Sequence, residues 1–142
     1  MKTKQIPNKA LAIMALVYLP AFAYSQETTV KWSVLTPATT PAKSRVYLAG
    51  NHPALGDWDP GRVELRKESD SLWTYTAKFP KAFRLEWKIT RGSWNNQAIY
   101  EQGVIPGNAF LDITKDTILI VRPRSWSDFG IQRIGKITGT VR

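Results

Sequence analysis

The sequence predicts an all-β protein with the fold of an immunoglobulin-like antiparallel β-sandwich. Short runs in which apolar residues alternate with polar ones are typical of half-buried strands. Stretches rich in Gly, Pro, Asn, Asp and Ser separate these runs at a spacing of about ten residues, which is typical of a sandwich. After the N-terminal segment, no window of ten residues carries the apolar stripe of an amphipathic helix. Together these observations favour two packed sheets.

The expected strands follow in order along the chain. In the first, Val30, Trp32 and Val34 share one face, because every second side chain of a strand points the same way. The polar Lys31 and Ser33 take the opposite face. The later expected strands cover residues 46–48, 73–79, 85–90 and 116–123, with a further strand near Phe110.

Residues 1–25 are predicted to be a secretory signal peptide. Three lysines in the first nine residues precede an apolar run at residues 10–20. Ala23 and Ser25 then supply the small residues of a cleavage site before Gln26. The apolar run is shorter than the ~20 residues that a membrane span needs. We therefore expect an exported protein, periplasmic or extracellular, that is not inserted in the membrane after signal cleavage.

The rest of the chain is predicted to contain one domain and a short tail. Residues 26–128 hold the expected strands and form the β-sandwich. The tail at residues 129–142, FGIQRIGKITGTVR, follows the last expected strand. Its residues Ile137, Thr138 and Val141 could begin a strand of a following module. The chain is then either a stand-alone module or a truncated part of a longer protein.

The composition narrows the function. The chain has 142 residues and no Cys, which removes disulfides, thiolate metal sites and Cys nucleophiles. The formal net charge is +9, but the basic residues are scattered and do not form the dense run that follows a phosphate backbone. The sequence also contains no phosphate-binding loop and no metal-ligand cluster. We expect no nucleic-acid partner, no cofactor and no metal.

The residues that could catalyse a reaction are few. His52 is the single histidine and lies in a turn before Pro53. Asp57 and Asp59 flank Trp58, but two carboxylates in a turn more often accept hydrogen bonds from the turn backbone than carry chemistry. His52 has no recognisable base, nucleophile or orienting partner. We therefore expect that the chain is not an enzyme.

The six tryptophans fall into two groups. Trp32, Trp73 and Trp87 lie on the inward faces of expected strands, where bulky aromatic side chains fill a sandwich core. Trp126 ends the last strand and is predicted to cover one end of the sandwich, because Trp is usually mostly buried.

Trp58 and Trp94 lie instead in polar, turn-rich loops, GDWDPG and RGSWNNQ. Each ring could fold back as a lid over the sandwich, or it could serve as a platform for a ligand. A flat apolar ring beside hydrogen-bonding groups suits a sugar, whose C–H face stacks on the ring while its hydroxyls need donors and acceptors. Two such loops in one chain favour the platform interpretation.

Two stretches, VYLAGNHPALGDWDPG and SLWTYTAKFPKAFRLEWKITRGSW, carry a resemblance to a known family. They resemble the starch-binding domain of the family-twenty carbohydrate-binding modules, with a match from about residue 29 to residue 126. The chain is also similar to the glycogen-binding domain of the AMP-activated kinase β subunit. The resemblance implies the sandwich fold of the starch-binding domain and non-catalytic binding of an α-glucan such as starch, glycogen or a maltooligosaccharide.

The resemblance also implies which residues form the site. Trp58, in L-G-x-W, and Trp94, in the loop after the E-x-K strand, would be the stacking platforms. Lys88 matches the lysine of that strand, and its alternation with Trp87 already places it on the outward face, where it can donate to a sugar hydroxyl. Asn108 and Glu101 are looser matches to the hydrogen-bonding positions of the family.

The resemblance implies a partner as well. The TRGSW stretch and the tail IGKITGTV are similar to exported bacterial proteins in which such a domain precedes an α/β-hydrolase-type esterase. An associated hydrolase is therefore an expected partner, although no esterase activity is expected of this chain itself. The alternative function is a binding-inactive accessory or interaction domain truncated from such an esterase-type hydrolase. The tyrosines of the family's second binding site have no counterpart that can be mapped here.

Overall fold

The structure is a computed structural model that describes residues 2–4, 17–18, 20 and 26–129. Most of the predicted signal peptide and all of the predicted tail except Phe129 lie outside the described residues. Among the residues that are described, no helix is long and apolar enough to cross a membrane.

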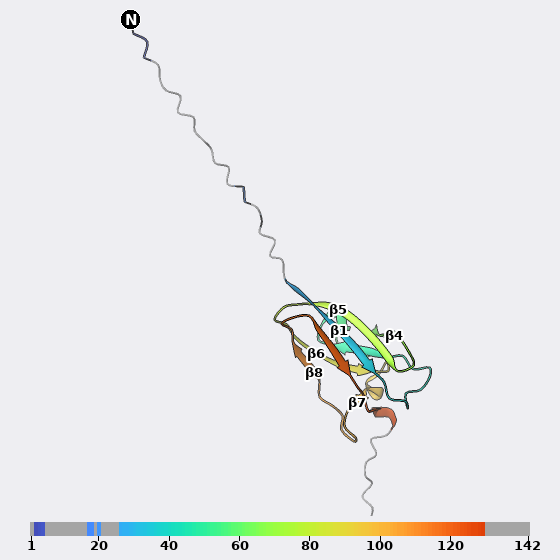
Figure 1. Ribbon diagram of the computed structural model, residues 1–142. Helices are drawn as coiled ribbons and strands as arrows, with labels where there is room; N and C mark the ends of the chain where they lie inside the picture. Colours follow the sequence, from blue (N-terminus) through green and yellow to red (C-terminus); the bar gives the residue numbers. More distant parts are fainter. Residues whose placement is uncertain (1, 5–16, 19, 21–25, 130–142) are drawn as a thin grey trace, which may run out of the picture.

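The described chain folds into two four-stranded sheets and a short strand pair (Figure 1). One sheet has the order β4-β5-β1-β9 and the other the order β3-β2-β6-β8. The third unit pairs β10 with β7. The strands are β1 (Glu27–Leu35), β2 (Tyr47–Gly50), β3 (Val63–Glu64), β4 (Arg66–Lys67), β5 (Leu72–Pro80), β6 (Arg84–Thr90), β7 (Ala98–Ile99), β8 (Ala109–Asp112), β9 (Thr117–Val121) and β10 (Ser125–Trp126). Three single-turn 3₁₀ helices complete the fold: η1 (Pro53–Leu55), η2 (Trp94–Asn96) and η3 (Ser127–Phe129).

The core confirms the predicted alternation. In β1 the inward residues Val30, Trp32 and Val34 are all fully buried. The Trp32 ring meets the rings of Phe79 and Trp87 edge-on, with centroids 5.9 and 5.8 Å apart. Such edge-to-face pairs add about 0.5–1.5 kcal/mol to the burial of the rings themselves. The predicted core role of the strand tryptophans is therefore confirmed.

The β-sandwich is confirmed, and the structure adds a detail of strand direction. β1 pairs antiparallel with β5 along nine residues, from Glu27 to Leu35. On its other side β1 pairs with β9 in parallel, with Val30 opposite Thr117. The chain reaches β9 from β8, in the other sheet, through the short segment 113–116.

The loop that follows β2 is fixed by its own side chains. His52 caps η1, since its Nδ1 accepts a hydrogen bond from the Ala54 amide at 3.1 Å. Its ring also meets the rings of Phe79 and Phe83 edge-on. Asp59 Oδ1 accepts a hydrogen bond from the Gly61 amide at 3.0 Å, which is the turn-fixing role expected of it. His52 and Asp59 thus build the loop that carries Trp58.

Candidate functional site

Trp58 and Trp94 come from different loops and meet at one surface. Trp58 follows η1, and Trp94 is the first residue of η2. Their ring centroids are 6.5 Å apart and the ring planes are inclined by 45°. Trp94 is 38% exposed and Trp58 is half-buried, so neither ring is sequestered in the core. The structure therefore brings together the two tryptophans that the sequence singled out.

The backbone at Trp58 is strained. Asp57 and Trp58 have φ angles of +50° and +66°, in the left-handed region that bulky residues rarely adopt. The conformation is held by the Trp58 amide, which donates a hydrogen bond to the Gly50 carbonyl at 2.9 Å. Strain of this kind persists only where the surrounding structure imposes it, and it is concentrated at functional sites.

Trp94 stands on a capped turn. The Ser93 hydroxyl accepts a hydrogen bond from the Asn95 amide at 3.2 Å, while Asn96 Oδ1 accepts from the Ser93 amide at 3.0 Å. This reciprocal capping box fixes both ends of the first turn. Asn96 Oδ1 also accepts from the Arg91 amide at 3.1 Å, which ties the turn to the end of β6. The Trp94 ring is therefore presented by a preorganised element.

Lys88 projects from the outward face of β6 towards these loops. Its ammonium donates to Gln97 Oε1 and to the Pro106 carbonyl, both at 2.9 Å. Two of the three donors are then used, and one remains for a ligand. Partial burial lowers the pKa of Lys88 below its ordinary value. Gln97 in turn donates to the Trp94 carbonyl at 3.2 Å, so the ammonium is linked to the Trp94 turn.

These side chains line one shallow hollow of about 360 Å³. The lining residues are Trp58, Lys88, Trp94, Gln97 and Asn108. Asn108 Nδ2 donates to Glu86 Oε2 at 3.1 Å, which leaves its carbonyl oxygen as an acceptor. Four of the five residues predicted for the site lie together here. The fifth lining residue, Gln97, was not predicted, although it follows Trp94 in the polar RGSWNNQ loop.

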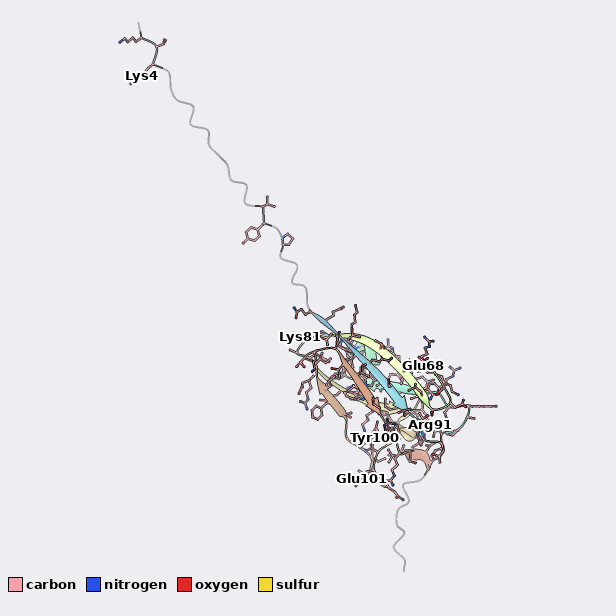
Figure 2. The ribbon with its side chains drawn as sticks, in the orientation of Figure 1. Lys4, Glu68, Lys81, Arg91, Tyr100 and Glu101 are labelled. Carbon is pink, nitrogen blue, oxygen red and sulfur yellow. The ribbon has the colours of Figure 1, made fainter. Side chains whose placement is uncertain are left out.

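Glu101 is the predicted site residue that does not line the hollow. It is exposed on the loop between β7 and β8, and its carbonyl accepts a hydrogen bond from the Val104 amide at 3.2 Å. Figure 2 shows it at the lower end of the body. Its role in the site stays a prediction.

A larger hollow of about 450 Å³ lies between the loop after β1 and the turn before β5. Trp73 is the aromatic residue among those that line it, and it is only 4% exposed. The ammonium of Lys67 lies 5.7 Å from the centroid of that ring. The described walls of this hollow therefore offer no open ring face, unlike the hollow beneath Trp58 and Trp94.

The hollow at Trp58 and Trp94 brings together groups that suit a sugar ligand. It combines two rings with a cationic donor, an amide acceptor and an open entrance, which is the set of groups that a polyhydroxylated ligand needs. In the described part of the chain, no group of three His, Asp or Glu could hold a metal ion. His52 is used as a helix cap and lies against Phe79 and Phe83 rather than in the hollow.

The strained backbone makes a prediction about Trp58. Alanine at this position would adopt the left-handed conformation at a cost of about 1–2 kcal/mol, whereas glycine adopts the same conformation without this cost. We expect Trp58→Gly to have a free energy of unfolding about 1 kcal/mol higher than Trp58→Ala, measured by urea denaturation. At Thr76, which is exposed in the middle of β5, the same pair of substitutions should show the usual opposite order. Equal stability of the two Trp58 variants would contradict the backbone conformation.

Comparison with known proteins gives concordant results. The family model described as starch binding domain matches residues 27–114. An α-amylase of Niallia circulans is 35% identical over 69 residues, a segment that covers 49% of this chain and 5% of that protein. The chain thus spans a small fraction of the length of this curated relative.

Two solved structures share the fold. The family 20 carbohydrate-binding module of the maltotetraose-forming amylase from Pseudomonas saccharophila STB07 matches with a TM-score of 0.50 and 20% identity, covering 67% of this chain and 99% of that one. A family 15 glucoamylase from Hypocrea jecorina matches with a TM-score of 0.54 and 18% identity, covering 70% of this chain and 17% of that one. Since the family match covers more than half of the chain, and both loop tryptophans lie within it, the chain belongs to the starch-binding domain family of non-catalytic carbohydrate-binding modules.

Proposed function

We propose that this chain binds an α-glucan at the hollow between Trp58 and Trp94. The observation that carries the proposal is the geometry of the two rings, which lie 6.5 Å apart and are inclined by 45°. Each ring can stack on the C–H face of one sugar. A contact of this type contributes about 1–3 kcal/mol where it has been measured for nucleic-acid bases, and a sugar should give this much or less.

The inclination of the rings favours an α-linked chain. An α-1,4-linked glucan curves, so successive sugar faces turn relative to one another and can meet two inclined rings. A β-1,4-linked glucan is a flat ribbon and suits rings that lie in one plane. The 45° angle is therefore the feature that selects starch, glycogen or a maltooligosaccharide over cellulose.

The polar residues of the hollow can orient the bound sugar through hydrogen bonds. The third donor of the Lys88 ammonium can reach a sugar hydroxyl, and the carbonyl oxygen of Asn108 can accept from another. Gln97 holds the Lys88 ammonium beside the turn that carries Trp94. A site of two rings and a few hydrogen bonds buries little area, so we expect a dissociation constant between about 1 μM and 1 mM.

The test is calorimetric titration of the chain with maltoheptaose. We expect binding by the unaltered chain, with cellohexaose as a ligand of the wrong linkage that does not bind. Trp94→Ala should weaken binding at least about tenfold, equivalent to about 1.4 kcal/mol, because one stacking face is lost. Trp94→Phe, which keeps a flat ring, should retain part of the affinity.

The control for this test is the far-ultraviolet circular dichroism of each variant, which should match that of the unaltered chain because Trp94 is exposed. If the unaltered chain fails to bind maltoheptaose and is not retarded in a gel containing starch or glycogen, the proposal is wrong. That result would favour the alternative of a binding-inactive interaction domain.

We also propose that the protein is exported and that its glucan-binding domain serves a hydrolase. The pattern of residues 1–25 supports export, and the Niallia α-amylase, of which the matched segment is 5%, supports association with a larger enzyme. The resemblance of the TRGSW and tail stretches makes an esterase-type hydrolase the first candidate.

Export is tested by mass spectrometry of the protein from the cell envelope. Gln26 should be the first residue, and an N-terminus at Met1 would contradict export by cleavage.

A further inference from the structure

The outward face of β6 and β8 continues beyond the hollow. Phe110 is paired with Glu86 across the two strands, and each lies two residues from a residue that lines the hollow, Asn108 and Lys88 respectively. Side chains two residues apart in a strand share a face and lie about 7 Å apart, as Glu86 and Lys88 do in β6. Asn108 stands one residue before β8 and reaches the same face through its hydrogen bond to Glu86. Phe110 and Glu86 therefore form the next row of the same surface.

Phe110 is held in place on this surface and is still open to solvent. The guanidinium carbon of Arg84 lies 4.0 Å from the centroid of its ring and so covers one face. Arg84 also forms ion pairs with Asp112 at 3.4 Å and with Glu86 at 3.8 Å, which fix its position. Phe110 is nevertheless 57% exposed, which leaves the other face and the edge of its ring to solvent.

Polar groups also lie beside this ring. Glu86 accepts a hydrogen bond from Asn108 Nδ2 at 3.1 Å, and this contact joins the row of Phe110 to the hollow. The Glu86 side chain is 35% exposed and the Arg84 side chain 54%. An acceptor and a donor therefore lie beside the exposed ring, both on the adjacent strand β6.

We propose that Phe110 is a further stacking site for the same α-glucan chain, with Glu86 and Arg84 as hydrogen-bonding partners for its hydroxyls. This inference rests on the proposed function, because it extends the ligand that occupies the hollow. The step of about 7 Å along β6, from Lys88 of the hollow to Glu86 beside Phe110, is comparable to the width of one to two sugar rings. Only a glucan longer than the segment held by Trp58 and Trp94 reaches Phe110.

The experiment compares two ligand lengths. The unaltered chain and Phe110→Ala are each titrated with maltotriose and with maltoheptaose. We expect Phe110→Ala to bind maltotriose as the unaltered chain does and to bind maltoheptaose about three- to tenfold more weakly. The gain in affinity from the short to the long ligand should therefore shrink in this variant.

Several outcomes separate this inference from the proposed function. If the unaltered chain binds both ligands and Phe110→Ala does the same with unchanged affinities, the Phe110 site is wrong and the hollow stands. An equal loss for both ligands would also overturn it, because such a loss reflects the fold. If the unaltered chain binds neither ligand, the proposed function itself fails.

Two further variants serve as controls, one for misfolding and one for the general loss of an exposed apolar side chain. Phe110→Leu keeps the apolar bulk and loses the flat ring, so it should show the same selective loss for maltoheptaose; unchanged affinity would overturn the inference. Ile118→Ala removes another strongly exposed apolar side chain, on β9, which belongs to the opposite sheet. It should leave both affinities unchanged, and a loss equal to that of Phe110→Ala would count against a site at Phe110.

Discussion

Replacing Gly50 with alanine is expected to lower the free energy of unfolding by about 3 kcal/mol or more. A Cβ atom at this position would lie 2.4 Å from the Glu86 carbonyl oxygen and 2.6 Å from Leu55 Cδ1. The first of these atoms belongs to the backbone of the neighbouring strand β6, so it cannot move aside by a change of rotamer. The effect is measured by urea denaturation.

The same substitution should also weaken glucan binding. The Gly50 carbonyl accepts the hydrogen bond from the Trp58 amide at 2.9 Å, and that contact holds the strained conformation of Trp58. A displacement of Gly50 away from Glu86 moves the acceptor and with it the ring. We therefore expect a loss of affinity for maltoheptaose in whatever fraction of Gly50→Ala remains folded.

Gly107→Ala is the matched control. A Cβ atom at Gly107 would meet nothing within 4 Å, although the residue lies between Pro106, whose carbonyl holds Lys88, and Asn108 of the hollow. The change should leave stability within about 0.5 kcal/mol of the unaltered chain, as for most surface substitutions. Equal effects of the two substitutions would show that the close approach at Gly50 does not limit stability.

The alternation of side chains made the strands predictable. In β1 and β6 every second residue is buried, and period two is a direct consequence of strand geometry, so the inward placement of Trp32 and Trp87 followed from the sequence. The burial of Trp126, at 1% exposure, followed from the general preference of Trp. Its indole nitrogen donates to Thr40 Oγ1 at 2.9 Å, across 86 residues of chain. That partner could not be read from local pattern.

Other features depend on contacts that periodicity does not encode. The parallel pairing of β9 with β1 depends on how the chain passes between sheets, and both strands would alternate in either direction. Lys88 was predicted as an outward donor, but the two acceptors that fix it come from different loops. Phe110 was expected only as part of a strand. Its importance emerges when its register places it beside Glu86, next to the row that contains Lys88.

The segment that supports the Trp94 turn lies beyond the residues that the family model matches. The family match ends at residue 114, whereas Ser127 donates from its amide to the Gln97 carbonyl and from its hydroxyl to the Asn95 carbonyl, both at 2.9 Å. Trp126 also pairs with Ala98 across β10 and β7. The C-terminal segment 125–129 therefore supports the turn that presents the Trp94 ring.

Arg91, which follows β6, connects this C-terminal segment to the sandwich. Its guanidinium forms an ion pair with Asp128 and lies over the rings of Trp126 and Phe129, 5.2 and 5.0 Å from their centroids. A further hydrogen bond reaches Ser44 Oγ at 3.4 Å. The Arg91 side chain is only 9% exposed, so these contacts are shielded from solvent far better than those of a surface pair.

Arg91→Ala is therefore expected to lower the free energy of unfolding by about 2–3 kcal/mol. The substitution leaves a gap between two rings and removes the partner of the Asp128 carboxylate, although that group is 38% exposed and regains part of its hydration. Because the C-terminal segment also positions Trp94, the affinity for maltoheptaose should fall as well. Urea denaturation and calorimetric titration measure the two effects.

Arg45→Ala provides the comparison that isolates burial as the cause. Arg45 pairs with Glu64 at 3.2 Å, but the two side chains are 68% and 42% exposed, and pairs of this kind contribute about 0–1 kcal/mol. Arg91→Lys keeps the charge and loses the planar group that covers the rings, so its stability should fall between those of the unaltered chain and Arg91→Ala. If Arg91→Ala costs no more than Arg45→Ala, the cluster around Arg91 does not stabilise the fold, and the Trp94 turn is held by its capping box and by the two hydrogen bonds of Ser127 without it.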